Sequence, residues 1–325
     1  MSEKTLLAPA KNKGIRQANI ELLRVLSMLM IITLHFFGHG GVLSNVEYGS
    51  LQYYFSWFLE GIAYVAVNCY VLIGGYFGIK SKFNFKKLFI LLCEVFFFSV
   101  AIYLIFVSTN KIDFSLNHFI QALFPTTLNR YWFITVYVSM YILSPFLNTA
   151  VNAMSKAQLK YCIMTVVFLF SIYPLIFSFA SFLNIGIGSG LVFGGGNGVV
   201  WFIVLYITAA YLRLHYSPTY NAKKSLIVYS LIAVIVPTSY FVINWLLKCY
   251  FPNSSSSLEN VAKVFYTYNS LPVYFASVAL FVLFLNIKLN NRSISKAISF
   301  FSANTLGVYL IHDNLYVRTF LWDKV

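Results

Sequence analysis

The stretch NIELLRVLSMLMIITLH, residues 19–35, places ionisable side chains along one apolar run. Arg24 and His35 are eleven positions apart, which is about three helical turns plus about 20°. Their side chains therefore leave a helix on one face, ~16 Å apart along its axis. The residues between them on that face, Met28 and Ile31, are apolar. A cation and an imidazole on such a helix are costly unless both face protein or water, so the stretch is interpreted as a functional site within a membrane-crossing helix.

The composition is that of an integral membrane protein. Of the 325 residues, 59% are hydrophobic and only 10% are charged, and the mean hydropathy is +0.75. Soluble globular domains are far more polar, so membrane lipids are expected to surround the chain. Many Tyr and Trp residues fall near the ends of apolar runs, as interface anchors do, and Trp132 and Trp201 are interpreted in this way.

The net charge of +14 does not predict a nucleic-acid partner. The basic residues are spread over short loops between apolar runs and form neither a dense patch nor a long tail. The four cysteines show no paired or metal-ligand spacing, so the sequence predicts no disulfide framework and no metal site.

Apolar runs long enough to cross a bilayer predict an all-α, polytopic bundle of nine to ten spanning helices. The nine runs lie near residues 19–38, 52–77, 86–107, 131–150, 160–182, 199–214, 224–248, 269–287 and 298–318. Two alternatives stay open for the last run: it is followed by a tenth helix, or it is re-entrant.

The distribution of Lys and Arg predicts a cytoplasmic N-terminus. With that orientation, seventeen of the 23 Lys and Arg residues fall on the inner side. The six on the outer side are Lys111, Arg130, Lys248, Lys263, Arg318 and Lys324. Residues 1–18 are predicted to form a basic cytoplasmic segment and residues 19–325 one membrane domain, with the first helix kept as a permanent span because it lacks a convincing cleavage site.

Ionisable residues near the outer ends of the predicted spans form one candidate site. His35 lies near the outer end of the first span, Glu60 is about 12 Å below the outer start of the second, and His312 and Asp313 lie in the outer half of the ninth. Two histidines and one or two carboxylates at a similar depth are suited to proton transfer. The alternative is that each only bonds a neighbouring helix or water.

Basic residues at the inner ends of the first three spans form a second candidate site. Arg24, Lys86 and Lys87, together with Lys80 and Lys82, are placed where a phosphate-bearing substrate would dock from the cytoplasm. The alternative is that the lysines only fix the topology and that Arg24 extends to the lipid headgroups.

Five segments resemble acyltransferase family 3, the membrane proteins that O-acylate sugars and cell-surface glycans. They occur in the expected order over nearly the whole chain: IELLRVLSMLMIITLH, VNCYVLIGGYFG, YWFITVYVSMYILSPFLN, WFIVLYITAAYLR and LGVYLIHDN. The first-helix Arg and His at this spacing, together with the other segments, make the resemblance fairly specific.

The resemblance implies a bundle of about ten helices that takes an acyl group from cytoplasmic acyl-CoA. His35 would be the catalytic histidine, as general base or as transient acyl carrier, and Arg24 would belong to the donor side. Lys86 and Lys87 stand where the family has an arginine pair. The expected activity is transfer of acetyl from acetyl-CoA to an extracellular polysaccharide or its lipid-linked precursor, at a bacterial plasma membrane.

Two other functions remain open from the residues alone. A transporter or flippase for a lipid-linked sugar would also line a path with buried charges, but the chain shows no repeated half with matching broken helices. A glycan polymerase would also use membrane carboxylates and basic groups, but the predicted outer loops are short and carry few basic residues.

Overall fold

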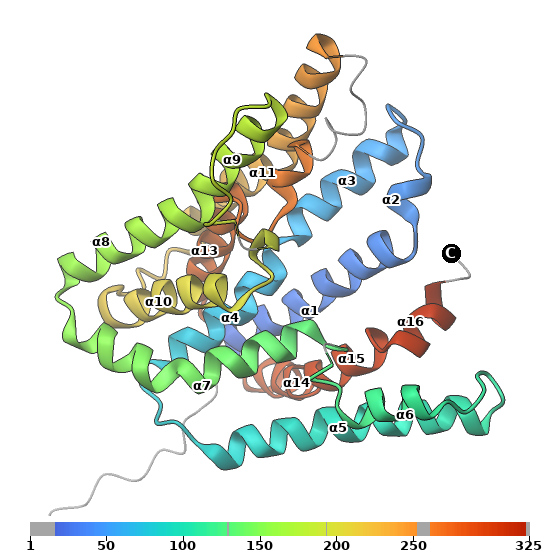
Figure 1. The fold of residues 1–325 in the computed structure, drawn as a ribbon. Helices are drawn as coiled ribbons and strands as arrows, with labels where there is room; N and C mark the ends of the chain where they lie inside the picture. The colour runs from blue at the N-terminus through green and yellow to red at the C-terminus, as the bar shows by residue number, and fades with distance from the viewer. Residues whose placement is uncertain (1–16, 129, 193, 252–260, 323–325) are drawn as a thin grey trace, which may run out of the picture.

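The computed structural model describes residues 17–128, 130–192, 194–251 and 261–322, which fold as a bundle of helices (Figure 1). No strand occurs in these four ranges, so the predicted all-α class is confirmed. The basic segment predicted over residues 1–18 lies outside the described residues except for its last two positions. The cytoplasmic position of the N-terminus therefore stays a prediction.

The helices of the first half are α1 (Ala18–His39), α2 (Val42–Asn45), α3 (Leu51–Ala63), α4 (Val65–Gly78), α5 (Phe85–Ser108), α6 (Leu116–Leu123), α7 (Trp132–Ala153), α8 (Lys156–Val167), the π-helical turn η1 (Phe168–Ile172) and α9 (Tyr173–Phe182). Those of the second half are the 3₁₀ turn η2 (Gly194–Gly196), α10 (Val199–His215), α11 (Ala222–Tyr250), the 3₁₀ turn η3 (Lys263–Tyr266), α13 (Leu271–Asn286), α14 (Arg292–Ala303), α15 (Thr305–His312) and α16 (Leu315–Trp322).

Each of the nine predicted apolar runs coincides with helix in the structure. Eight helical segments of the described chain are long and apolar enough to cross a membrane. The ninth, α10, is also apolar but has only 17 residues, of which ten are buried and none is exposed. The prediction of a polytopic helical bundle is confirmed in this sense.

The last predicted span, residues 298–318, is not one continuous helix. It is divided into α14, α15 and α16 at Asn304 and at the pair Asp313 and Asn314. Short polar side chains compete with the helix by bonding nearby backbone groups, and the Asn314 side chain accepts a hydrogen bond of 3.1 Å from the Tyr316 amide. This break puts His312 and Asp313 at the end of a helix, where their side chains turn toward α1.

The centre of the bundle is α4, which packs against α1, α10 and α13. Small residues allow this close approach, as is usual between membrane helices. A Cβ atom added at Gly75 would lie 2.8 Å from the Tyr206 Cα atom of α10, so only glycine fits there.

A buried polar chain also ties α4 to its neighbours. The Asn68 side-chain nitrogen Nδ2 donates to the Tyr268 backbone carbonyl at 2.9 Å, and the Trp201 indole donates to the Asn68 side-chain oxygen Oδ1 at 3.2 Å. Because the Trp201 side chain is 2% exposed, its interpretation as an interface anchor is wrong.

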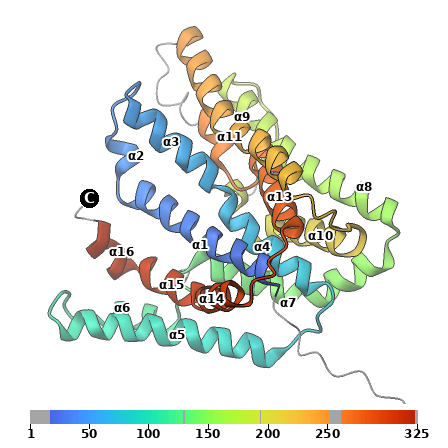
Figure 2. The same ribbon diagram turned by 180° about the vertical axis from the view of Figure 1, so that it is seen from behind.

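Figures 1 and 2 show where the first and last thirds of the chain meet. The helix α1 packs against α4 and also against α14 and α15, and α5 with α6 runs along the outside of α15 and α16. The residues predicted to be functional at the two ends of the chain therefore come together in one region.

Candidate active site

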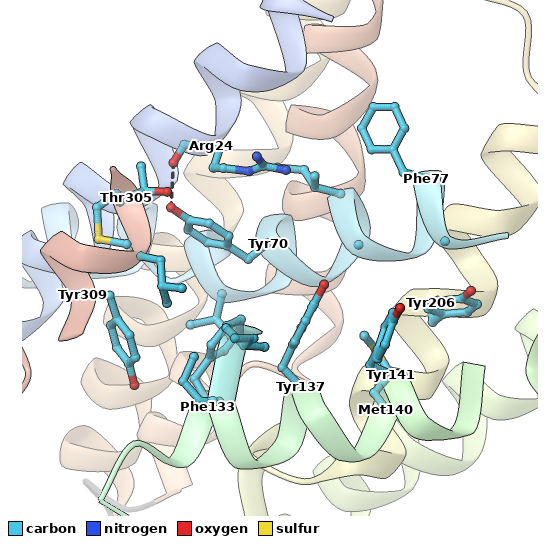
Figure 3. Close-up of a pocket in the computed structure, with 18 of the residues that line it drawn as sticks. Arg24, Tyr70, Phe77, Phe133, Tyr137, Met140, Tyr141, Tyr206, Thr305 and Tyr309 are labelled. Carbon is cyan, nitrogen blue, oxygen red and sulfur yellow. Dashed lines mark hydrogen bonds between the residues drawn. The ribbon is translucent and has the colours of Figure 1, made fainter. Parts of the chain in front are cut away.

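A cavity of about 470 Å³ lies between α1, α4, α7 and the segment α14–α15 (Figure 3). Its volume is within the range of about 300–1,000 Å³ that is typical of small-molecule sites. Both Arg24 and His35 line it, as do Met28 and Ile31 between them. The face of the first helix that the sequence singled out is therefore one wall of a single cavity.

At one end of this cavity Arg24 is held by an ion pair. Its Nη1 atom lies 3.2 Å from the Glu21 Oε2 atom, and the Ser302 hydroxyl of α14 donates to that same carboxylate oxygen. The Tyr70 hydroxyl donates to the Arg24 carbonyl at 2.9 Å. Figure 3 shows the guanidinium extended over α4, with the hydroxyls of Tyr137 and Tyr141 pointing into the cavity from α7.

Lysines from the connection between α4 and α5 and from the first turn of α5 complete this end. Lys82 and Lys87 line the cavity, whereas Lys86 is exposed and does not. Of the predicted pair Lys86 and Lys87, only Lys87 therefore faces the cavity, because adjacent residues of a helix point about 100° apart. Lys82, which the sequence placed only in the wider basic group, joins Arg24 and Lys87 instead.

At the other end of the cavity His35 is bonded to His312. The His35 Nδ1 atom lies 2.9 Å from the His312 Nε2 atom, and the His312 Nδ1 atom lies 2.7 Å from the Val308 carbonyl oxygen. A carbonyl can only accept, so we assign the proton of neutral His312 to Nδ1. Its Nε2 atom then accepts from His35 Nδ1–H, which leaves His35 Nε2 as the proton acceptor of the ring.

Asp313 places a carboxylate beside this pair of rings. Its Oδ1 atom lies 3.5 Å from His35 Nδ1, 3.9 Å from His39 Nε2 and 3.6 Å from Arg318 Nη1. The carboxylate is buried, with Asp313 5% exposed, and its negative charge lies beside the imidazoles of His35 and His39. The predicted association of His35, His312 and Asp313 is therefore present in the structure, and it also includes His39 and Arg318.

Glu60 does not take part in this cluster in the part of the chain that the structure describes. It is buried at 7% exposure on α3, and its Oε2 atom has no hydrogen-bond partner among the described residues. The sequence predicted that Glu60 and His35 lie at a similar depth, but their side chains are not brought into contact.

The same cluster could be considered as a metal site. Ligand atoms of His35, His39 and Asp313 all lie within 4.8 Å of one another. However, Arg318 Nη1 lies 3.3 Å from the His39 Nε2 atom and 3.6 Å from the Asp313 carboxylate. Because a guanidinium already supplies the positive charge at this position, we interpret the cluster as one for proton transfer.

Aromatic residues that the sequence analysis did not assign to either candidate site also line the cavity. Trp132 stacks on Tyr268 with ring centroids 5.7 Å apart, and both line the cavity, so the interpretation of Trp132 as an interface anchor is wrong. Phe133, Tyr137 and Tyr141 also line it. Their i, i+4 spacing on α7 is a signal that predicts one shared helix face.

The fold and this cavity define a class: a multi-pass membrane protein with a cluster of histidines and a carboxylate at one end of an internal site and a cationic group at the other. The sequence model of acyltransferase family 3, described as an acyltransferase domain, matches residues 17–323. The chain belongs to this family and is a membrane acyltransferase. Comparisons with curated proteins and with solved structures gave no match.

The hydrogen bond from His35 to His312 generates a prediction. His312→Ala removes the acceptor that keeps the His35 proton on Nδ1, and we expect acyl transfer to fall by ~10²-fold. His312→Gln is the matched control, because its Oε1 atom can accept the same hydrogen bond, and it should retain activity within about tenfold of the wild type. Equal loss in both variants, measured as initial rates on purified protein, would contradict the assignment.

Proposed function

We propose that this protein transfers an acetyl group from cytoplasmic acetyl-CoA to a hydroxyl of an extracellular polysaccharide or its lipid-linked precursor, at a bacterial plasma membrane. The observation that carries the proposal is that a single cavity has Arg24 at one end and His35 at the other. A donor with anionic phosphates and an acceptor with a hydroxyl need these two kinds of group.

The donor would enter at the cationic end. Arg24 bonds Glu21 through Nη1, so the other N–H groups of its planar fork are free to meet phosphate oxygens, with Lys82 and Lys87 as additional charges. The thioester arm would extend along α1 past Met28 and Ile31, over ~16 Å of helix, toward His35. Tyr70 and Tyr137 supply polar groups along this path without adding charge.

The acceptor hydroxyl would meet the thioester at His35. The Nε2 atom takes the hydroxyl proton while the oxygen attacks the thioester carbonyl carbon, and the tetrahedral intermediate collapses with cleavage of the carbon–sulfur bond. The imidazolium then gives its proton to the CoA thiolate, so that an ester and a thiol are the products. Asp313, at 3.5 Å from His35 Nδ1, stabilises the imidazolium while it exists.

A second route uses the same atoms in two steps. His35 Nε2 attacks the thioester and carries the acetyl group as an acyl-imidazole before the hydroxyl takes it. The two routes differ in whether acetylated protein accumulates when the acceptor is withheld, which a mass measurement of the intact protein distinguishes.

The role of His35 gives the most direct prediction from this proposal. His35→Ala should abolish acetylation of the surface glycan, measured by mass spectrometry of that glycan, while the protein remains folded and inserted. His118→Ala, an exposed histidine at the start of α6, is the control and should leave acetylation unchanged. Normal acetylation by His35→Ala would exclude this mechanism.

The different positions of Lys86 and Lys87 give a prediction for the donor. Each exposed charge contact contributes about 0.2–1 kcal/mol, so Lys82→Gln combined with Lys87→Gln should raise the KM for acetyl-CoA by about tenfold. Lys86→Gln removes the same charge from a side chain that does not line the cavity, and its KM should stay within about twofold of the wild type. If Lys86→Gln raises KM as much as the double variant, the phosphates bind elsewhere.

A further inference from the structure

A second cleft of about 250 Å³ lies between the helical turn η1, α9 and the segment that runs from η3 into α13. None of its lining residues belongs to the proton-transfer cluster or to the cationic end of the main cavity. By the predicted topology, the loops that border it, after α9 and before α13, are on the outer side of the membrane. This is the side on which the acceptor is expected.

The two cavities share one wall, which is the turn at residues 267–269. Thr267 and Asn269 line the second cleft, while Tyr268 between them lines the main cavity. The backbone forms a turn here, in which the Ser270 amide donates to the Thr267 carbonyl at 3.0 Å. A molecule that occupies both spaces therefore contacts three consecutive residues of one segment.

The glycine-rich loop before α10 holds this segment in place. The Tyr268 amide donates to the Gly195 carbonyl at 3.0 Å. A Cβ atom added at Gly196, whose φ is +87°, would lie 2.7 Å from the Asn269 backbone nitrogen. The wall is therefore built by close backbone packing and does not depend on long side chains.

The lining of the second cleft includes a polar group without a partner. The Ser171 hydroxyl is buried, with the residue 3% exposed, and makes no hydrogen bond to the described residues. Ser171 lies in the π-helical turn η1, and such turns are frequent at functional sites. The Asn269 amide nitrogen donates to the Phe170 carbonyl at 2.8 Å, which leaves its oxygen as an acceptor. Pro174, Phe265 and Pro272 supply apolar walls.

We infer that this cleft binds a sugar unit of the acceptor glycan next to the unit that receives the acetyl group. The inference rests on the proposed function. A sugar ring presents hydroxyls that satisfy Ser171 and Asn269, and apolar C–H faces that pack on Phe265 and the prolines. A lipid chain would leave the Ser171 hydroxyl without a partner. A chain of sugar units that crosses Tyr268 reaches from this cleft into the main cavity.

The test compares acceptors of different length. Fragments of one and of three sugar units, prepared from the surface polysaccharide of cells that lack this protein, serve as acceptors for purified enzyme with acetyl-CoA. Wild-type kcat/KM should be at least about tenfold higher for the longer fragment. Ser171→Leu fills the cleft and should abolish this preference, while kcat/KM for the single unit and the KM for acetyl-CoA stay within about twofold.

Two further variants make the outcome decisive. Ser171→Ala removes only the hydroxyl and should lower the preference by several-fold, even if the leucine variant does not fold. Ser181→Leu, at an exposed position of α9, makes the same change outside the cleft and should keep the full preference. Equal preference in wild type and both Ser171 variants, or none in the wild type, overturns this inference alone. Absence of any acetyl transfer by the wild type overturns the proposed function as well.

Discussion

The structure depends on the cost of placing ionisable groups inside an apolar bundle. Such groups are stable there only when they are paired or face water. In this protein, α1 meets this requirement through the same partner segment at both ends. Ser302 of α14 donates to Glu21, which holds Arg24, and His312 of α15 bonds His35. These two contacts fix α14 and α15 against α1, and the cavity lies alongside them.

This arrangement explains how groups of different chemistry share one site. The cationic end and the imidazole end are separated by about three helical turns, and the wall between them is apolar on α1 and aromatic on α7. Tyrosines give this middle section hydrogen-bonding capacity without charge, which avoids further desolvation cost. A long donor can therefore lie along the helix with its anionic part at one end and its reactive carbonyl at the other.

The residues at both ends of the cavity could largely be predicted, because helical periodicity relates residues that are close in sequence. The common face of Arg24 and His35 follows from their spacing alone, and polar residues at the end of the chain drew attention to His312 and Asp313. The breaks at Asn304 and after His312, which turn those side chains toward α1, were not predicted, since an apolar run gives little sign of a turn within it.

Other features depend on how distant helices pack, which the sequence does not contain. The predicted depth in the membrane suggested Glu60 as a neighbour of His35. Depth alone does not determine on which side of the bundle a helix lies or in which direction its side chains point. Arg318 was counted only as an outer-side charge, although its guanidinium lies 3.6 Å from Asp313. Trp132 and Trp201 were interpreted from their positions at the ends of spans, whereas contacts with Tyr268 and Asn68 place them inside the bundle.

In the proposed mechanism, one cavity connects a cytoplasmic donor with an acceptor on the other side of the membrane. Inside-out vesicles that contain the protein and the glycan test it directly, because their cytoplasmic face is exposed to the medium. With acetyl-CoA labelled in the acetyl group and added outside, we expect label to accumulate on glycan within the lumen. Label that remains on CoA, or that reaches glycan only when acetyl-CoA is admitted to the lumen, would contradict it.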